Sequence, residues 1–208
     1  MKEKKKRSCG ETVETKIFQS DQINHAAALL RQGELVAFPT ETVYGLGANA
    51  LLPKSVAQVF AVKGRPSDNP LIVHVVDFPM TQKFVESYHP LTEKIVKNFW
   101  PGPLTLIFSI KSGSLSPVVT GGLSTAAFRM PDNKKTLSLI EETGAPLVGP
   151  SANTSGKPSP TTAMHVYHDL KGKIAGILDD GATQIGVEST VLDLSGEVPT
   201  ILRPGAVT

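Results

Sequence analysis

Short apolar runs alternate with helix-like stretches along nearly the whole chain, and this alternation limits the fold more than any other feature. Helices are predicted from Ser20 or Asp21 up to Gly33, and over residues 53–63, 91–99, 134–143 and 162–170. Strands are predicted over residues 35–38, 71–76, 104–110, 125–130, 146–148, 174–178, 187–194 and 199–202. The 16 prolines and 18 glycines are scattered at the ends of these stretches, where they stop one element before the next. The alternation predicts an α/β fold.

Length and apolar content predict one domain. A chain of 208 residues with 40% apolar residues can bury a substantial core, and no linker divides residues 15–208. No apolar run is long enough to span a membrane, and no apolar signal core follows the charged N-terminus. The single cysteine, Cys9, cannot form an internal disulfide, which fits a reducing compartment. The sequence therefore predicts a cytoplasmic protein that makes no membrane contact.

The positive charge of the chain is concentrated at its N-terminus. Residues 1–7 carry five Lys or Arg and one Glu, a local charge of +4, which leaves 16 cations and 18 anions, or −2, in the remainder. We expect residues 1–14 to be a charged, disordered leader, with nonspecific attraction to RNA as the alternative. A duplex-binding surface normally shows a broad basic stripe. The near-neutral body favours a small anionic ligand instead.

The loop over residues 63–71 places two cations in a rigid setting. Lys63 and Arg65 flank a glycine, and Pro66 and Pro70 restrict the backbone that follows. A solvated helix surface does not need that rigidity. We therefore expect the loop to hold both cations toward an anion.

Three other segments present polar groups where a predicted strand ends. Arg129 stands two residues before Pro131, Arg203 directly precedes Pro204, and residues 149–156 crowd hydroxyls and an amide after a short strand. Guanidinium groups bind carboxylate or phosphate with two hydrogen bonds, and hydroxyls in such a turn can donate to phosphate or ribose. The alternatives are surface ion pairs for the arginines and a self-capping turn for the hydroxyls. Taken together, the segments predict one polar pocket.

The role of residues 39–47 and of His74 stays open at this point, whereas missing motifs exclude two classes of enzyme. Residues 39–47 either orient a small polar substrate or form a polar turn with Tyr44 half-buried, and His74 is either a core histidine or a ligand contact. No phosphate-binding loop of the Walker A type is present. The turn at Ser151 lacks the second glycine of a serine-hydrolase elbow. His165 and His168 have no third metal ligand nearby, so we interpret them as surface histidines.

These motifs, in this order and spacing, resemble the YrdC-type L-threonylcarbamoyladenylate synthases. The segments that carry the resemblance are residues 39–47, 63–71 with His74, 100–105, 128–131, 151–160, 186–190 and 203–205. The resemblance spans about residues 15–208. It implies a twisted, mixed, mostly parallel open sheet with flanking helices and a concave basic cavity.

The resemblance also implies an activity. The family joins L-threonine, bicarbonate and ATP into threonylcarbamoyl-AMP and releases pyrophosphate, a nucleotidyltransferase reaction. A downstream threonylcarbamoyl-transferase complex then modifies an adenosine of tRNA. Mg²⁺ would arrive with ATP, and no metal site on the protein is implied.

Site residues follow from the resemblance by motif position. Lys63 and Arg65 are implied to be catalytic through charge stabilisation. The residues implied to bind ATP are Lys63, Arg65, Asn69, Thr125, Ser151, Asn153, Ser159 and Arg203. Those implied to bind threonine are Thr42, His74, Arg129 and Ser189.

Two competing functions use the same cavity. One is an RNA-binding module with possible direct RNA contact, although the charge of −2 and the lack of aromatic stacking platforms count against it. The other is a paralogue without synthase activity. The family also includes longer members with a second C-terminal domain, so we expect either a short-form enzyme or the N-terminal domain of a longer one.

Overall fold

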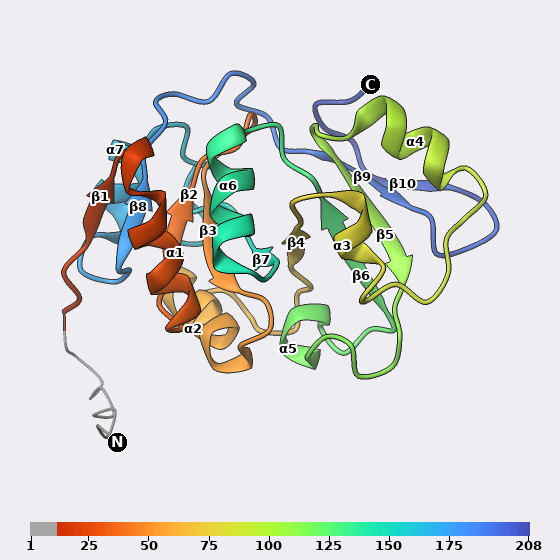
Figure 1. The fold of residues 1–208 in the computed structure, drawn as a ribbon, viewed down its shortest axis with the longest axis horizontal. Helices are drawn as coiled ribbons and strands as arrows, with labels where there is room; N and C mark the ends of the chain where they lie inside the picture. Colours follow the sequence, from red (N-terminus) through yellow and green to blue (C-terminus); the bar gives the residue numbers. More distant parts are fainter. Residues whose placement is uncertain (1–11) are drawn as a thin grey trace.

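The computed structural model describes residues 12–208 and places them in one α/β unit (Figure 1). Within these residues, ten strands form one sheet in the order β1-β8-β2-β3-β7-β4-β6-β5-β9-β10. The predicted single domain with an α/β fold is confirmed. The predicted leader and Cys9 fall largely or wholly in residues 1–11, outside the described residues, so the leader remains a prediction.

The strands are β1 (Lys16–Phe18), β2 (Val36–Phe38), β3 (Gly45–Asn49), β4 (Ile72–His74), β5 (Leu104–Ser109), β6 (Thr125–Arg129), β7 (Leu147–Val148), β8 (Gly176–Leu178), β9 (Thr190–Asp193) and β10 (Thr200–Arg203). The α-helices are α1 (Ile23–Arg31), α2 (Pro53–Lys63), α3 (Phe78–Thr81), α4 (Thr92–Phe99), α5 (Pro117–Thr120), α6 (Lys134–Thr143) and α7 (Ala163–Leu170). A 3₁₀ turn, η1 (Ser20–Gln22), precedes α1.

The sheet is mixed, as the resemblance implied, but it is not mostly parallel. Over residues 12–208 the parallel pairs are β1–β8, β2–β8, β4–β6 and β5–β9. The antiparallel pairs are β2–β3, β3–β7, β4–β7, β5–β6 and β9–β10. Antiparallel pairs outnumber parallel pairs among these residues because β3 and β7, in the middle of the sheet, each run antiparallel to both of their neighbours.

Helix α2 shows how local sequence sets an element's bounds. Pro53 occupies its first turn, where no backbone N–H is needed. Gly64 ends the helix in the left-handed conformation (φ 62°), which glycine adopts without steric cost. Both ends agree with the prediction, and the helix therefore delivers Lys63 and Arg65 to a fixed point.

Strand β3 was missed because its glycines suggested a turn. A side chain at Gly47 would lie 2.5 Å from the carbonyl oxygen of Val36 and 2.8 Å from the ring of Phe38. The glycine permits close packing of β2 on β3, which is a second reason for glycine in a strand. The edge strand β1 and the four-residue helices α3 and α5 were missed because they are too short to show a period.

Two hydrophobic clusters hold the sheet between its helices. The larger contains Leu46, Val73 and Phe128, and the smaller packs α1 and α6 together through Leu30 and Ile140. Helices α1 and α6 lie in front of the sheet in this view (Figure 1). In the described residues no helix is long and apolar enough to cross a membrane.

Candidate active site

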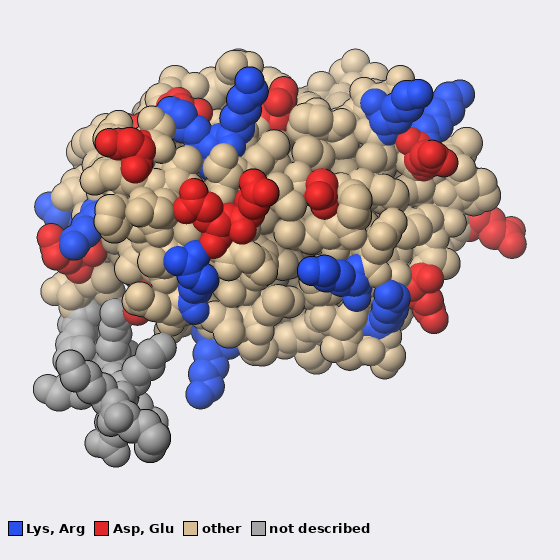
Figure 2. All heavy atoms as spheres, in the orientation of Figure 1, with Lys and Arg blue, Asp and Glu red and all other residues tan. Residues whose placement is uncertain are grey.

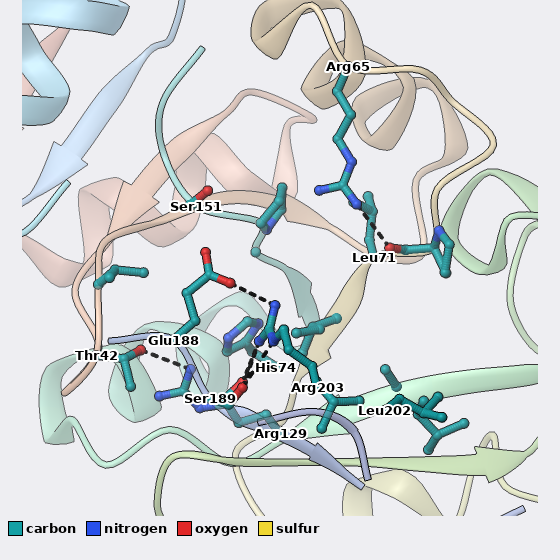
Figure 3. Close-up of a pocket in the computed structure, with 18 residues that line it drawn as sticks. Thr42, Arg65, Leu71, His74, Arg129, Ser151, Glu188, Ser189, Leu202 and Arg203 are labelled. Carbon is teal, nitrogen blue, oxygen red and sulfur yellow. Dashed lines mark hydrogen bonds and ion pairs between the residues drawn. The ribbon is translucent and has the colours of Figure 1, made fainter. Parts of the chain in front are cut away.

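A cavity of about 320 Å³ opens where β4 and β6 end side by side (Figure 3). His74 and Arg129 are register partners on these parallel strands, so their side chains reach the same edge of the sheet. The start of β9 and the end of β10 close another side. Seven of the predicted site residues line the cavity: Thr42, Arg65, His74, Arg129, Ser151, Ser189 and Arg203. The predicted single polar pocket is therefore present.

Arg129 is buried and held from three sides. Its Nη2 forms an ion pair with Glu41, its Nη1 donates to Thr42 Oγ1 (3.1 Å), and its Nε donates to the carbonyl oxygen of Gly102 (3.3 Å). Glu41 also accepts from the backbone N–H of Asp132 (2.8 Å). Burial lowers the pKa of Arg129, and the neighbouring Glu41 opposes that shift. The guanidinium group is thus fixed in one orientation at the wall of the cavity.

His74 contributes a neutral ring. Burial, and then the neighbouring charge of Arg129, lowers its pKa to about 3, so the imidazole is uncharged at neutral pH. Its Nδ1 has no hydrogen-bond partner within residues 12–208. The ring packs edge-on against Phe38 (centroids 5.2 Å apart). A buried ring nitrogen without a partner at a cavity wall can serve a ligand.

Ser189 and Arg203 form the opposite wall. Arg203 Nη2 donates to the carbonyl oxygen of Ser189 (2.8 Å) and to its Oγ (3.2 Å), and Nη1 pairs with Glu188 (2.7 Å). Ser189 Oγ also shares a hydrogen bond with Thr105 Oγ1 (2.8 Å). Glu188 accepts a second bond from Ser159 Oγ (3.2 Å). This wall is a hydrogen-bonded network that joins β5, β9 and β10.

Arg65 reaches into the cavity from the loop after α2 (Figure 3). Among residues 12–208 its side chain makes one long hydrogen bond, from Nη2 to the carbonyl oxygen of Pro70 (3.4 Å). Among the described residues it forms no ion pair. Burial lowers the pKa of Arg65, while the charge of Glu188 opposes the shift. Its guanidinium group is available to an anion.

Lys63 lies behind this loop and is almost fully buried. Its Nζ donates to the carbonyl oxygens of Ser151 and Asn153 (2.6 Å for the latter), and burial, then Arg65, lowers its pKa to about 8. The ammonium group therefore ties α2 to the loop at residues 151–156. Asp169 on α7 holds the same loop from outside through the N–H of Thr154 (2.7 Å).

The remaining predicted residues lie away from the cavity lining. Asn69 is exposed in its loop, and Thr125 is half-buried at the start of β6. Asn153 is buried and uses its amide to donate to the carbonyl oxygens of Thr154 and Lys157. Ser159 touches the site only through Glu188. Their roles toward ATP remain predictions.

Sequence reasoning missed two carboxylates that hold the site arginines. Glu41 and Glu188 each directly precede a predicted site residue, Thr42 and Ser189. That adjacency was the available signal. Pairing each acid with its arginine needed the tertiary structure, because 88 residues separate Glu41 from Arg129.

The segment 39–47 combines both of its predicted alternatives. Thr42 lines the cavity, as a substrate contact requires. Tyr44 is fully buried rather than half-buried, because its hydroxyl donates to the carbonyl oxygen of Gly181 (2.7 Å). Burial raises its pKa to about 12. The phenol is a structural anchor here and does not face the cavity.

Charges on the face seen in Figure 2 are mixed in sign, with acidic and basic side chains interspersed. No basic stripe crosses this view.

Within residues 12–208 no group of three or more His, Cys, Asp or Glu could hold a metal ion. His165 and His168 are exposed on α7, which agrees with their interpretation as surface histidines.

Known proteins share both the sequence and the fold. The Sua5_yciO_yrdC family model, described as telomere recombination, matches residues 28–205. A protein of Bacillus subtilis named threonylcarbamoyl-AMP synthase is 57% identical over 187 residues, covering 90% of this chain and 54% of its own length. One of the same name from Pyrococcus abyssi is 53% identical over 186 residues, covering 89% and 54%.

Solved structures agree. The structure of P. abyssi Sua5 complexed with L-threonine has a TM-score of 0.89 at 50% identity, over 92% of this chain and 58% of that one. E. coli YciO matches with a TM-score of 0.82 at 19% identity, over 93% and 96%, which shows the shared fold alone. The chain spans about half the length of the relatives named threonylcarbamoyl-AMP synthase above. Because the family model covers most of the sequence, the chain belongs to the Sua5_yciO_yrdC family.

Proposed function

We propose that this protein is an L-threonylcarbamoyladenylate synthase, which forms threonylcarbamoyl-AMP and pyrophosphate from L-threonine, bicarbonate and ATP. The observation that carries the proposal is one cavity with two chemically different ends. A buried, oriented end contains Thr42, His74 and Arg129, and an open cationic end contains Arg65. The relative from P. abyssi, solved with L-threonine, supports an amino-acid site in this fold.

The oriented end suits the amino acid. Arg129 uses three of its five N–H groups on protein acceptors within the described residues, which leaves two for a carboxylate. His74, Thr42 and Ser189 line the same cavity. They offer hydrogen bonds to the amine and hydroxyl of threonine.

The open end suits the phosphates of ATP. Arg65 lacks a carboxylate partner among residues 12–208, and Lys63 keeps one N–H beyond the two that it donates to carbonyl oxygens. Ser151 lines the same cavity, and its carbonyl oxygen accepts a hydrogen bond from Lys63. We assign Asn69, Thr125, Asn153, Ser159 and Arg203 to the nucleotide side as well, directly or through Glu188.

The reaction needs no covalent nucleophile from the protein. The threonine amine attacks the carbon of bicarbonate, and a carbamate forms with loss of water. A carbamate oxygen then attacks the α-phosphorus of ATP, and the bond to pyrophosphate breaks. Arg65 and Lys63 stabilise negative charge on the phosphate oxygens, and Arg129 holds the amino acid in line. No general base is assigned.

The residues present fit a Mg²⁺ ion that arrives on ATP and do not form a metal site of their own. The only carboxylate of the cavity lining, Glu188, is already bonded to Arg203 and Ser159. When bound to the triphosphate, Mg²⁺ neutralises charge on its oxygens. We further propose a downstream complex that transfers the threonylcarbamoyl group to tRNA. The cytoplasmic location stays a prediction.

Pyrophosphate release tests the proposal directly. We expect release that requires ATP, L-threonine and bicarbonate together, in a buffer with Mg²⁺. Omitting any one of the three substrates is the control. Release that is independent of L-threonine would contradict the proposal. ATP binding without release would point either to the N-terminal domain of a longer enzyme or to the paralogue, and RNA binding would then be measured.

A further inference from the structure

The positive charge of Arg129, at the end of β6, is neutralised by a buried carboxylate. Arg129 and Glu41 form an ion pair whose side chains are only 5% and 6% exposed. Glu41 is held by a second bond, from the backbone N–H of Asp132. Both partners of this pair are therefore shielded from solvent. The pair therefore presents guanidinium N–H groups to the cavity with little net charge behind them.

No other charge close to this end restores a positive potential. His74, a titratable side chain that lines this end, is neutral above its pKa of about 3. Arg203 on the facing wall is balanced by Glu188. Arg65, which lacks such a partner among residues 12–208, lies at the other end of the cavity (Figure 3). The cavity is thus divided into a charged end and a nearly neutral, hydrogen-bonding end.

This division separates two kinds of anion. A phosphate dianion that leaves water needs compensating positive charge, since its desolvation is costly. A zwitterionic amino acid has no net charge, so it needs directed N–H donors more than net potential. An unpaired arginine in the same place would attract either.

We propose that Glu41 is a specificity-determining positioning residue, which makes the Arg129 end of the cavity accept an amino-acid carboxylate and reject phosphate. The inference rests on the proposed function, since it concerns the threonine end of that site. Glu41 would act through Arg129 and would not touch the substrate. Its effect would prevent the triphosphate of ATP from occupying the threonine end.

Calorimetric titration of L-threonine, without ATP, tests this with inorganic phosphate as the competitor. In the unaltered protein we expect the Kd for L-threonine to change little with phosphate. In Glu41→Gln, which keeps a hydrogen-bonding group of similar shape, we expect phosphate to compete with L-threonine at least about ten-fold more strongly, because one nearby negative charge is removed. Glu86→Gln, which removes an exposed carboxylate that does not line the cavity, is the control, and its L-threonine binding should stay insensitive to phosphate. Glu41→Asp, which keeps the charge, should resemble the unaltered protein.

A Glu41→Gln protein that binds L-threonine and ignores phosphate would overturn the inference. A second measurement needs no variant. The phosphonate analogue of L-threonine replaces the carboxylate by a group of higher charge, and we expect the unaltered protein to bind it at least about ten-fold more weakly than L-threonine. Equal binding of the two would also overturn the inference. If the unaltered protein binds no L-threonine, the proposed function fails at its amino-acid end, and this result is distinct from both others.

Discussion

The two arginine–glutamate pairs of the cavity differ mainly in burial. The Arg129–Glu41 pair is 5% and 6% exposed, and the Arg203–Glu188 pair is 40% and 42% exposed. A buried pair costs desolvation of both ions but loses far more when one partner is removed. An exposed pair contributes little either way. The comparison teaches that the Arg129 wall of the cavity is built into the core, while the Arg203 wall is assembled near the surface.

The largest expected effect breaks the buried pair. Glu41→Ala should lower the free energy of unfolding by about 3–5 kcal/mol, because Arg129 would remain buried without a counter-charge. Glu188→Ala, the matched change in the exposed pair, should cost about 1 kcal/mol or less. Urea unfolding of both variants measures the difference. Equal losses would show that burial does not separate the two pairs.

Removing the unpaired arginine should affect catalysis and leave stability nearly unchanged. Arg65→Ala should reduce pyrophosphate release about 10²- to 10³-fold, since a donor to the charge of the transition state is lost. Its unfolding free energy should stay within about 0.5 kcal/mol of the unaltered protein, because the side chain makes one long hydrogen bond. Turnover comparable to that of the unaltered protein would refute the phosphate role.

Ser189→Ala probes the wall between the two ends. Ser189 Oγ accepts from Arg203 and shares a hydrogen bond with Thr105. We expect the KM for L-threonine to rise up to about ten-fold, the usual worth of one hydrogen bond, and the KM for ATP to change less than about two-fold. Steady-state kinetics with each substrate varied gives both values. Equal losses on both substrates would contradict this division of the cavity.

The smallest expected effect concerns Lys63. Its buried Nζ donates to two carbonyl oxygens and forms no ion pair among residues 12–208. The pKa of Lys63 is lowered to about 8, so its charge is lost as pH rises through that value. The KM for ATP should then rise a few-fold, while the KM for L-threonine stays level. Folding stability changes in the opposite sense, since it rises as the charge of Lys63 is lost. Because the folded pKa lies below the ordinary value of 10.5, burying the charge costs stability below about pH 8, and this cost is relieved between about pH 8 and 10.5.

Kinetics and urea unfolding over this pH range measure both trends. A KM for ATP that stays constant across pH 8 would contradict a role of Lys63 in binding the phosphates of ATP. Its role would then be limited to holding residues 151–156 in place.

Sequence reasoning predicted the fold class, most helices and seven of the residues that line one pocket. Helices α2 and α6 have the predicted bounds because each begins and ends with strong local signals, including a glycine with positive φ at the C-terminal end. Strand direction was not predictable in this way. Whether β3 and β7 run parallel or antiparallel depends on long-range pairing, which has no local signature.

The sequence by itself determined where the cations and hydroxyls stand along the chain and that each ends an element, since proline and glycine act locally. Only the tertiary structure decided which charges remain available. Glu41 meets Arg129 and Glu188 meets Arg203, whereas Arg65 meets no acid among residues 12–208. Burial then sets how much each ion pair contributes to stability, because the free energy of an ion pair depends on how much water its partners have lost. The same residue type thus forms a buried ion pair at one place in the cavity wall and has no carboxylate partner among residues 12–208 at another.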